Sequence, residues 1–84
     1  MPELEVGVVT HYFDRPHVAI VKMTADQIRL GDQIHIKGAH TDITETVASM
    51  EVEHHKLEVA QPPVEVGLQV ADRVRTGDRV FKVG

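Results

Sequence analysis

The sequence of 84 residues predicts an all-β fold, a single domain built as a small closed antiparallel barrel of six strands. Only 4% of the residues are aromatic, so the core must consist mainly of valine and isoleucine, which favour pleated sheets. One phrase also occurs twice, in residues 28–38 and 74–84, where an aliphatic residue and an arginine lead through a Gly-Asp turn into a β-rich run. The same turn before two strands favours a small closed sheet.

The first two predicted strands form a hairpin. They cover residues 5–12 and 17–23, after an N-terminal tail of residues 1–4. The turn between them holds Asp14, which favours turn positions, and Pro16, which has no N–H to donate to a ladder. The hairpin tip is therefore expected to interrupt the sheet.

Each copy of the repeated phrase predicts a tight turn followed by a strand. Gly31 and Gly77 can adopt positive φ without steric cost, and the aspartate after each can satisfy backbone N–H groups at the corner. The strands that follow are residues 33–37 and 79–83. Residues 24–27, just before the first copy, form a connection with room for one helical turn.

The longest predicted strand covers residues 43–54, and its apolar pattern changes face near Val47 and Ala48. A β-bulge or a sharp bend would produce this change, and barrels need such corners. A helix is disfavoured because threonine and valine, which recur here, are poor helix formers. Residues 61–63 form a rigid link to a further strand at residues 65–70.

Composition excludes several classes of protein. The chain has no cysteine, which rules out disulfides, zinc–thiolate sites and cysteine nucleophiles. Its net charge of −4 lacks the basic surplus that duplex DNA binding requires. No apolar run is long enough to cross a bilayer, and the acidic N-terminus does not resemble a signal peptide. We therefore expect a cytoplasmic location, no membrane association and no cofactor.

The six histidines raise the question of a metal site. His11 and His17 flank the first turn and, with Asp14 between them, could provide three ligands. None of the histidine spacings is a recognised metal-binding one. The alternative is that all six are structural or surface residues, and the sequence favours this interpretation.

The first turn also carries the best candidates for an exposed contact. Tyr12 and Phe13 lie at the hairpin tip beside Arg15. Aromatic residues with arginine are enriched at binding hot spots, and aromatic faces stack on unpaired bases. The alternative is that at least one of the two aromatics covers the end of the core, since aromatic residues are scarce in this chain.

The sequence predicts no enzymatic activity. Ser49 lacks the context of a nucleophile elbow and has no evident triad partners. Glu51 and Glu53 share one face of a predicted strand, which many surface glutamates do. Nothing in the pattern specifies a reaction.

Four stretches, taken in order, resemble the second domain of elongation factor Tu, the small β-barrel that follows the GTPase domain. They are residues 30–38, 46–51, 66–70 and 74–80. The chain looks closer still to small stand-alone elongation-factor-like proteins. It is also similar to a barrel appended to collagenase-like peptidase family proteins, some of which act in transfer-RNA modification. The GTPase phosphate loop is absent, so no bound nucleotide is expected.

The resemblance implies a role for one carboxylate. In elongation factor Tu this barrel helps to hold the aminoacylated 3′ end of transfer RNA, and a glutamate after the strand bend contacts the terminal ribose. The matching position here is Glu51. His54 stands where the family has an arginine, and residues 10–16 replace the family's glycine-rich opening. The alternative is that Glu51 is an ordinary solvated residue.

Two functions are therefore predicted from different classes. The first is a non-catalytic binding module that contacts a transfer-RNA 3′ end or a protein of translation or transfer-RNA modification. The second is a structural accessory barrel that docks onto another polypeptide or self-associates, without an RNA role. The candidate contact residues are Glu51, His54, Tyr12, Phe13 and Arg15.

Overall fold

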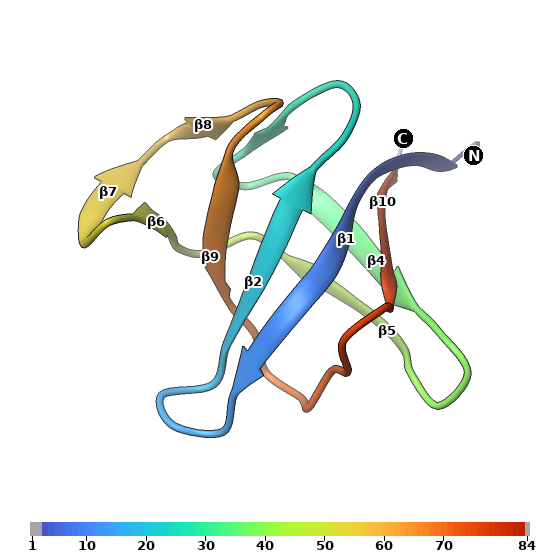
Figure 1. Ribbon diagram of the computed structural model, residues 1–84. Helices are drawn as coiled ribbons and strands as arrows, with labels where there is room; N and C mark the ends of the chain where they lie inside the picture. The colour runs from blue at the N-terminus through green and yellow to red at the C-terminus, as the bar shows by residue number, and fades with distance from the viewer. Residues whose placement is uncertain (1–2, 84) are drawn as a thin grey trace.

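The computed structural model describes residues 3–83 and confirms the all-β prediction (Figure 1). Across these residues ten strands form one eight-stranded sheet and one two-stranded sheet, and every pairing is antiparallel. The strands are β1 (Glu3–Phe13), β2 (Val18–Met23), β3 (Ile28–Arg29), β4 (Gln33–Lys37), β5 (Asp42–Thr46), β6 (Met50–Val52), β7 (His55–Leu57), β8 (Val59–Ala60), β9 (Glu65–Gln69) and β10 (Arg79–Val83).

The large sheet curls into a barrel-like shape, but the predicted closed six-stranded barrel is wrong. The hydrogen-bonded order is β5-β4-β10-β1-β2-β9-β6-β7, and its two end strands, β5 and β7, do not pair with each other (Figure 1). The two-stranded sheet β3-β8 lies outside this order. The sheet is therefore open between β5 and β7.

The sheet is open between β5 and β7 because the segment of residues 43–54, predicted as one strand, is bent. The segment splits into β5, which pairs with β4, and β6, which pairs with β9. Between them Val47 leaves the ladder: its N–H donates to the Asp32 carbonyl at 2.8 Å, and its carbonyl accepts from Gly31 N–H at 2.9 Å. The predicted change of face is confirmed, because Val47 and Met50 are both buried whereas Ala48 is exposed.

The end of that segment turns back as a hairpin that the sequence did not predict. Val52 pairs with His55, so Glu53 and His54 form a two-residue loop. Both have positive φ, 50° and 67°, as a type I′ turn requires. Asn-Gly is the usual signal for this turn, and Glu-His gives no such signal.

The two copies of the repeated phrase have the same structure. Gly31 and Gly77 have φ of 90° and 96°, which confirms the predicted turns. Asp32 Oδ2 accepts a hydrogen bond from Arg29 N–H, and Asp78 Oδ2 accepts one from Arg75 N–H, both at 2.9 Å. The strands that follow, β4 and β10, pair antiparallel with each other. The two turns therefore lie at opposite ends of one strand pair.

The core is aliphatic, as the composition predicted. Its fully buried large side chains come from seven of the ten strands and from the loop before β10: Val6, Val9, Val21, Met23, Ile28, Ile34, Ile36, Met50, Val66, Leu68, Val74 and Val80. The described residues leave no buried side-chain nitrogen or oxygen atom without a hydrogen-bond partner. Tyr12 packs against this core from the side, half-buried.

The start of β1 and the connection after β2 differ from the sequence prediction. β1 begins at Glu3, because Glu3 and Leu4 pair with Val83 and Lys82, so the predicted tail is wrong for these two residues; residues 1–2 lie outside the described part of the chain. Residues 24–27 form a bend rather than a helical turn, since Thr24 and Ala25 N–H groups donate to a strand carbonyl. No helix that could span a membrane occurs in the part of the chain described.

Candidate functional site

The structure brings four of the five candidate contact residues to one groove. Phe13 and Arg15 reach it from the β1–β2 hairpin tip, and Glu51 and His54 reach it from β6 and the turn after it. The groove has a volume of about 440 Å³. The two hairpins are far apart in sequence, and β9 lies between β2 and β6 in the sheet.

The floor of the groove is apolar. It is formed by Val18 and Ile20 of β2 and by Gly67 of β9. Gly67 pairs with both Ile20 and Glu51, so it lies at the point where β2, β9 and β6 run side by side. A Cβ at this position would lie 3.3 Å from a Val18 methyl carbon. The absence of a side chain at Gly67 therefore leaves space in the groove above β9.

The wall on the β1–β2 side carries an exposed aromatic ring. Phe13 is 45% exposed, although apolar rings are usually buried. The His11 ring meets it edge-on, with the ring centroids 4.4 Å apart. Because His11 supports the ring from one side, Phe13 keeps an exposed surface at the edge of the groove.

The charged groups of the groove are mostly acidic. Arg15 and His54 face three carboxylates, those of Glu51, Glu53 and Glu65. Glu65 lies within hydrogen-bond distance, 3.2 Å, of Thr10 Oγ1. Glu51 is half-buried and its side chain has no hydrogen-bond partner among residues 3–83. Such a site suits a ligand rich in hydroxyl donors with few phosphates.

Tyr12, the fifth candidate, does not reach the groove. Neighbouring strand residues point to opposite faces, so Tyr12 points toward the core side while Phe13 points outward. Its hydroxyl group lies 3.0 Å from His17 Nδ1, which holds the ring across the hairpin. Tyr12 therefore covers the end of the core, which was the alternative left open for one of the two aromatics.

The residues of the possible metal site have other partners. His17 is engaged with Tyr12, and His11 packs on Phe13. Within residues 3–83 no group of three or more histidine, aspartate and glutamate side chains is placed to hold a metal ion. The structure thus does not assemble His11, Asp14 and His17 into a metal site.

A cluster of His35 with the carboxylates of Glu3 and Asp42, on the outer face of β4, was not predicted. His35 Nδ1 lies 2.9 Å from Glu3 Oε2, and His35 Nε2 is paired with Asp42. Hydrogen bonds to Asp42 and to Glu3 raise the pKa of His35, and the bond to His35 lowers the pKa of Asp42. A neutral imidazole has only one N–H, so two carboxylate partners require the charged form. The residues are remote in sequence, which leaves no pattern to detect.

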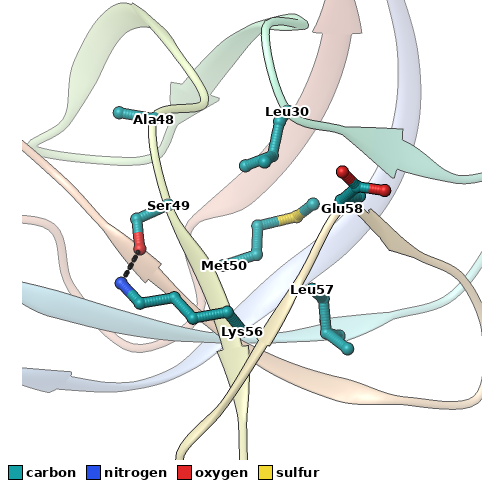
Figure 2. A pocket seen from close by; sticks show the side chains of 7 residues that line it. All are labelled: Leu30, Ala48, Ser49, Met50, Lys56, Leu57 and Glu58. Carbon is teal, nitrogen blue, oxygen red and sulfur yellow. Dashed lines mark hydrogen bonds between the residues drawn. The ribbon is translucent and has the colours of Figure 1, made fainter.

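A smaller apolar hollow of about 170 Å³ lies beside the β6–β7 hairpin (Figure 2). Leu30 and Met50 point toward one another across it, and Leu57 lies at its edge. At its rim Lys56 Nζ donates a hydrogen bond of 3.1 Å to Ser49 Oγ. The hydroxyl group of Ser49 is therefore a hydrogen-bond acceptor for a lysine at the rim.

Sequence comparison connects the chain to part of a larger protein. No protein-family model matches. The chain is 34% identical over 80 residues, 94% of its length, to "Uncharacterized protease MJ0090" of Methanocaldococcus jannaschii. It spans only 19% of that relative, so most of the relative lies outside the match.

Comparison with solved structures shows the fold. The C-terminal domain of a putative U32 peptidase from Geobacillus thermoleovorans superposes with a TM-score of 0.86 at 20% identity, covering 96% of this chain and 93% of that domain. Its selenomethionine variant gives 0.78 at 18% identity, with 94% and 98% covered. The predicted similarity to a barrel appended to collagenase-like peptidases is thus supported, whereas kinship with elongation factor Tu stays a prediction. The chain has the fold of a U32 peptidase C-terminal domain.

Proposed function

We propose that this chain is a non-catalytic binding module whose groove takes the 3′ end of an RNA, with transfer RNA as the first candidate. The observation that carries the proposal is the meeting of Phe13, Arg15, Glu51 and His54 in one groove. These residues were selected from sequence on two separate grounds, the hairpin tip and the implied ribose contact. Their convergence supports a common ligand.

The chemistry of the groove fits one terminal nucleoside. The exposed face of Phe13 suits stacking on a base, a contact that any base can make. Glu51 can accept hydrogen bonds from the two hydroxyl groups of a terminal ribose, which internal nucleotides and DNA lack. Arg15 can pair with one phosphate. The three carboxylates disfavour a run of several phosphates in the same place, so an RNA end fits better than an internal segment.

The lining also supports a module without catalysis. Among the described residues that form the groove, none carries a hydroxyl or thiol nucleophile. Glu51 lies on the short strand β6, and Glu53 lies in the two-residue turn after it. Binding without chemistry is the simpler use of this arrangement.

Fluorescence anisotropy with labelled transfer RNA tests the proposal. We expect Phe13→Ala to weaken binding about tenfold or more, because base stacking contributes about 1–3 kcal/mol. Leu4→Ala is the matched control, since Leu4 is also exposed but lies at the other end of β1. Glu51→Gln should weaken binding of intact RNA but not of RNA whose terminal ribose has been opened by periodate, and Glu58→Gln should change neither. Equal binding of both RNAs by all variants would refute the proposal.

A second candidate is an accessory domain that docks onto a larger polypeptide. The match to a small part of a protein named as a protease favours it. Two exposed apolar residues offer a contact surface: Leu30 (43% exposed), which lines the hollow of Figure 2, and Val59 (39% exposed), which pairs with the neighbouring Arg29. Sedimentation analysis of the chain mixed with the Methanocaldococcus relative, from which the matched segment has been deleted, tests this function. Docking that Leu30→Asp abolishes and Phe13→Ala leaves unchanged would support it.

A further inference from the structure

A second hollow lies on the core side of the β1–β2 hairpin tip and carries two arginines. It has a volume of about 270 Å³. From β1 and the turn after it come His11, Tyr12 and Asp14, and from the loop before β10 come Arg73, Val74, Arg75 and Thr76. No function described above uses this hollow, and Arg75 appears above only as part of the repeated phrase.

The loop that carries the arginines is firmly held at both ends. Val70 N–H donates to the His17 carbonyl at 2.9 Å, and Gly77 N–H donates to the Val9 carbonyl at 2.8 Å. Between these points Val74 is 1% exposed, so its side chain anchors the loop in the core. Arg73 and Arg75 flank this anchor, and both are exposed. The backbone is thus fixed while the two side chains are accessible.

The two guanidinium groups have no ionic partner in the described chain. Arg79 pairs with Glu5 at 2.7 Å and Lys82 lies 3.7 Å from Asp32, but Arg73 and Arg75 form no ion pair within residues 3–83. Among the residues that line the hollow, Asp14 has the one carboxylate. Apart from the two arginines, the other titratable side chains of the lining are those of His11 and Tyr12. In a chain of net charge −4, two unpaired arginines at one hollow form a local positive site.

The hollow and the groove are neighbours. His11 lines the hollow, and its ring contacts the ring of Phe13, which lines the groove. Tyr12 and Asp14 also line the hollow and alternate along the chain with Phe13 and Arg15 of the groove, so the hairpin tip lies between the two sites. A chain whose end occupies the groove can pass over His11 and continue into the hollow.

We propose that this hollow binds a backbone phosphate of the RNA whose terminal nucleoside occupies the groove. The inference rests on the proposed function and adds the path of the RNA to it. Guanidinium groups match phosphate oxygens in a bidentate geometry, and two of them neutralise the charge that the glutamates of the groove repel. Two separate sites would let an acidic protein hold an RNA end. The carboxylates of the groove accept hydrogen bonds from the ribose hydroxyl groups, and the arginines of the hollow bind the phosphate.

Salt-dependent binding of a short single-stranded RNA tests the inference. Arg73→Gln and Arg75→Gln should each weaken binding by roughly tenfold, and the double variant should lower the slope of log K against log salt by about 0.7, the value for one phosphate contact on a single strand. Lys37→Gln, at the end of β4, is the matched control and should leave the slope unchanged. Binding of free adenosine, which has no phosphate, should not respond to either arginine variant. Thermal unfolding of each variant checks that the loop remains folded.

Two outcomes separate this inference from the proposed function. If Phe13→Ala weakens RNA binding while the arginine variants behave like Lys37→Gln, the phosphate site is refuted and the groove stands. If no variant affects RNA binding, the proposed function fails, and inorganic phosphate then serves as the probe. If inorganic phosphate shifts the amide resonances of Arg75 and Thr76, and the double arginine variant abolishes these shifts, the phosphate site stands. If phosphate causes no shifts at these residues, the phosphate site is refuted.

Discussion

Gly38 and Asp78 lie against each other where β4 ends and β10 begins. A Cβ on Gly38 would collide with Asp78 Oδ1, and Asp78 cannot move aside because its Oδ2 holds the Arg75 N–H at 2.9 Å. Asp78 as a whole is only 4% exposed. One glycine is therefore required by a neighbouring side chain rather than by its own backbone conformation.

A double-mutant cycle tests this dependence. Gly38→Ala should lower the free energy of unfolding by about 1–3 kcal/mol, the usual cost of overpacking. In an Asp78→Ala background the same substitution should cost less than about 0.5 kcal/mol, because the colliding oxygen is gone. Urea unfolding of the four proteins measures the coupling. Additive effects of the two substitutions would contradict the contact.

His35 makes the stability depend on pH in a defined window. Its pKa is raised from 6.5 by Asp42 and Glu3, so its contribution is complete below about 6.5 and is lost as the pH rises through the folded-state pKa. The pKa of Asp42 is lowered from 3.8, so its contribution is present above that value and is lost as the pH falls through its folded-state pKa. The pair therefore stabilises the fold most between these limits.

Urea unfolding of wild type and His35→Gln as a function of pH checks this. We expect the stability difference between the two to be largest near about pH 5.5 and to shrink toward pH 9, where the wild-type imidazole has lost its charge. His40→Gln, in an exposed loop, is the control and should give a difference that does not follow this profile. A constant difference for His35→Gln across the range would show that packing alone is involved.

At the scale of elements, strands bounded by strong turn signals were predicted almost residue by residue. β4 and β10 follow Gly-Asp corners and have the predicted bounds, and β9 differs by one residue. The β6–β7 hairpin was missed because its turn residues, Glu53 and His54, rarely adopt positive φ. The sequence placed them in a continuous strand, since nothing in the local pattern favours a reversal there.

That turn is open to stabilisation. Replacing Glu53 and His54 together by Asn and Gly should raise the free energy of unfolding by about 1 kcal/mol, because both new residues accept the type I′ backbone. The same double variant should bind RNA less tightly, since His54 belongs to the groove. Thermal unfolding and anisotropy on one sample measure both effects. A fall in stability would mean that the original side chains hold the hairpin by contacts outside the turn.

At the scale of the molecule, the sheet depends on pairing between the beginning and the end of the chain. β10 lies between β1 and β4, so it joins two parts of the sheet that have no other shared ladder. Removal of residues 79–84 should therefore abolish the cooperative unfolding transition seen by circular dichroism, although β1, β2 and β9 remain in the sequence. Retention of a sharp transition would show that the remaining strands close on their own.

The sequence predicts the local features of this fold but not those that depend on contacts between distant parts of the chain. Periodicity revealed the strands, and the repeated phrase revealed the two corners, because both are local properties. The open edge between β5 and β7 depends on where Val47 bonds to the first corner, which is a long-range contact. Phe13, Arg15, Glu51 and His54 were predicted from the sequence as separate candidate contacts, but their meeting in one groove, and its floor at Gly67, required the sheet order.

The pairing of Glu3 with Val83 also decides how the domain is attached to anything else. Both ends of the described chain emerge side by side, while the hairpin tip with Phe13 lies at the far end of β1, an 11-residue strand that spans roughly 30 Å (Figure 1). Any polypeptide fused to either end would join the domain where Glu3 pairs with Val83. The β1–β2 hairpin tip would then point away from the junction. In such a fusion the groove beside the hairpin tip would lie at the opposite end of β1 from the junction.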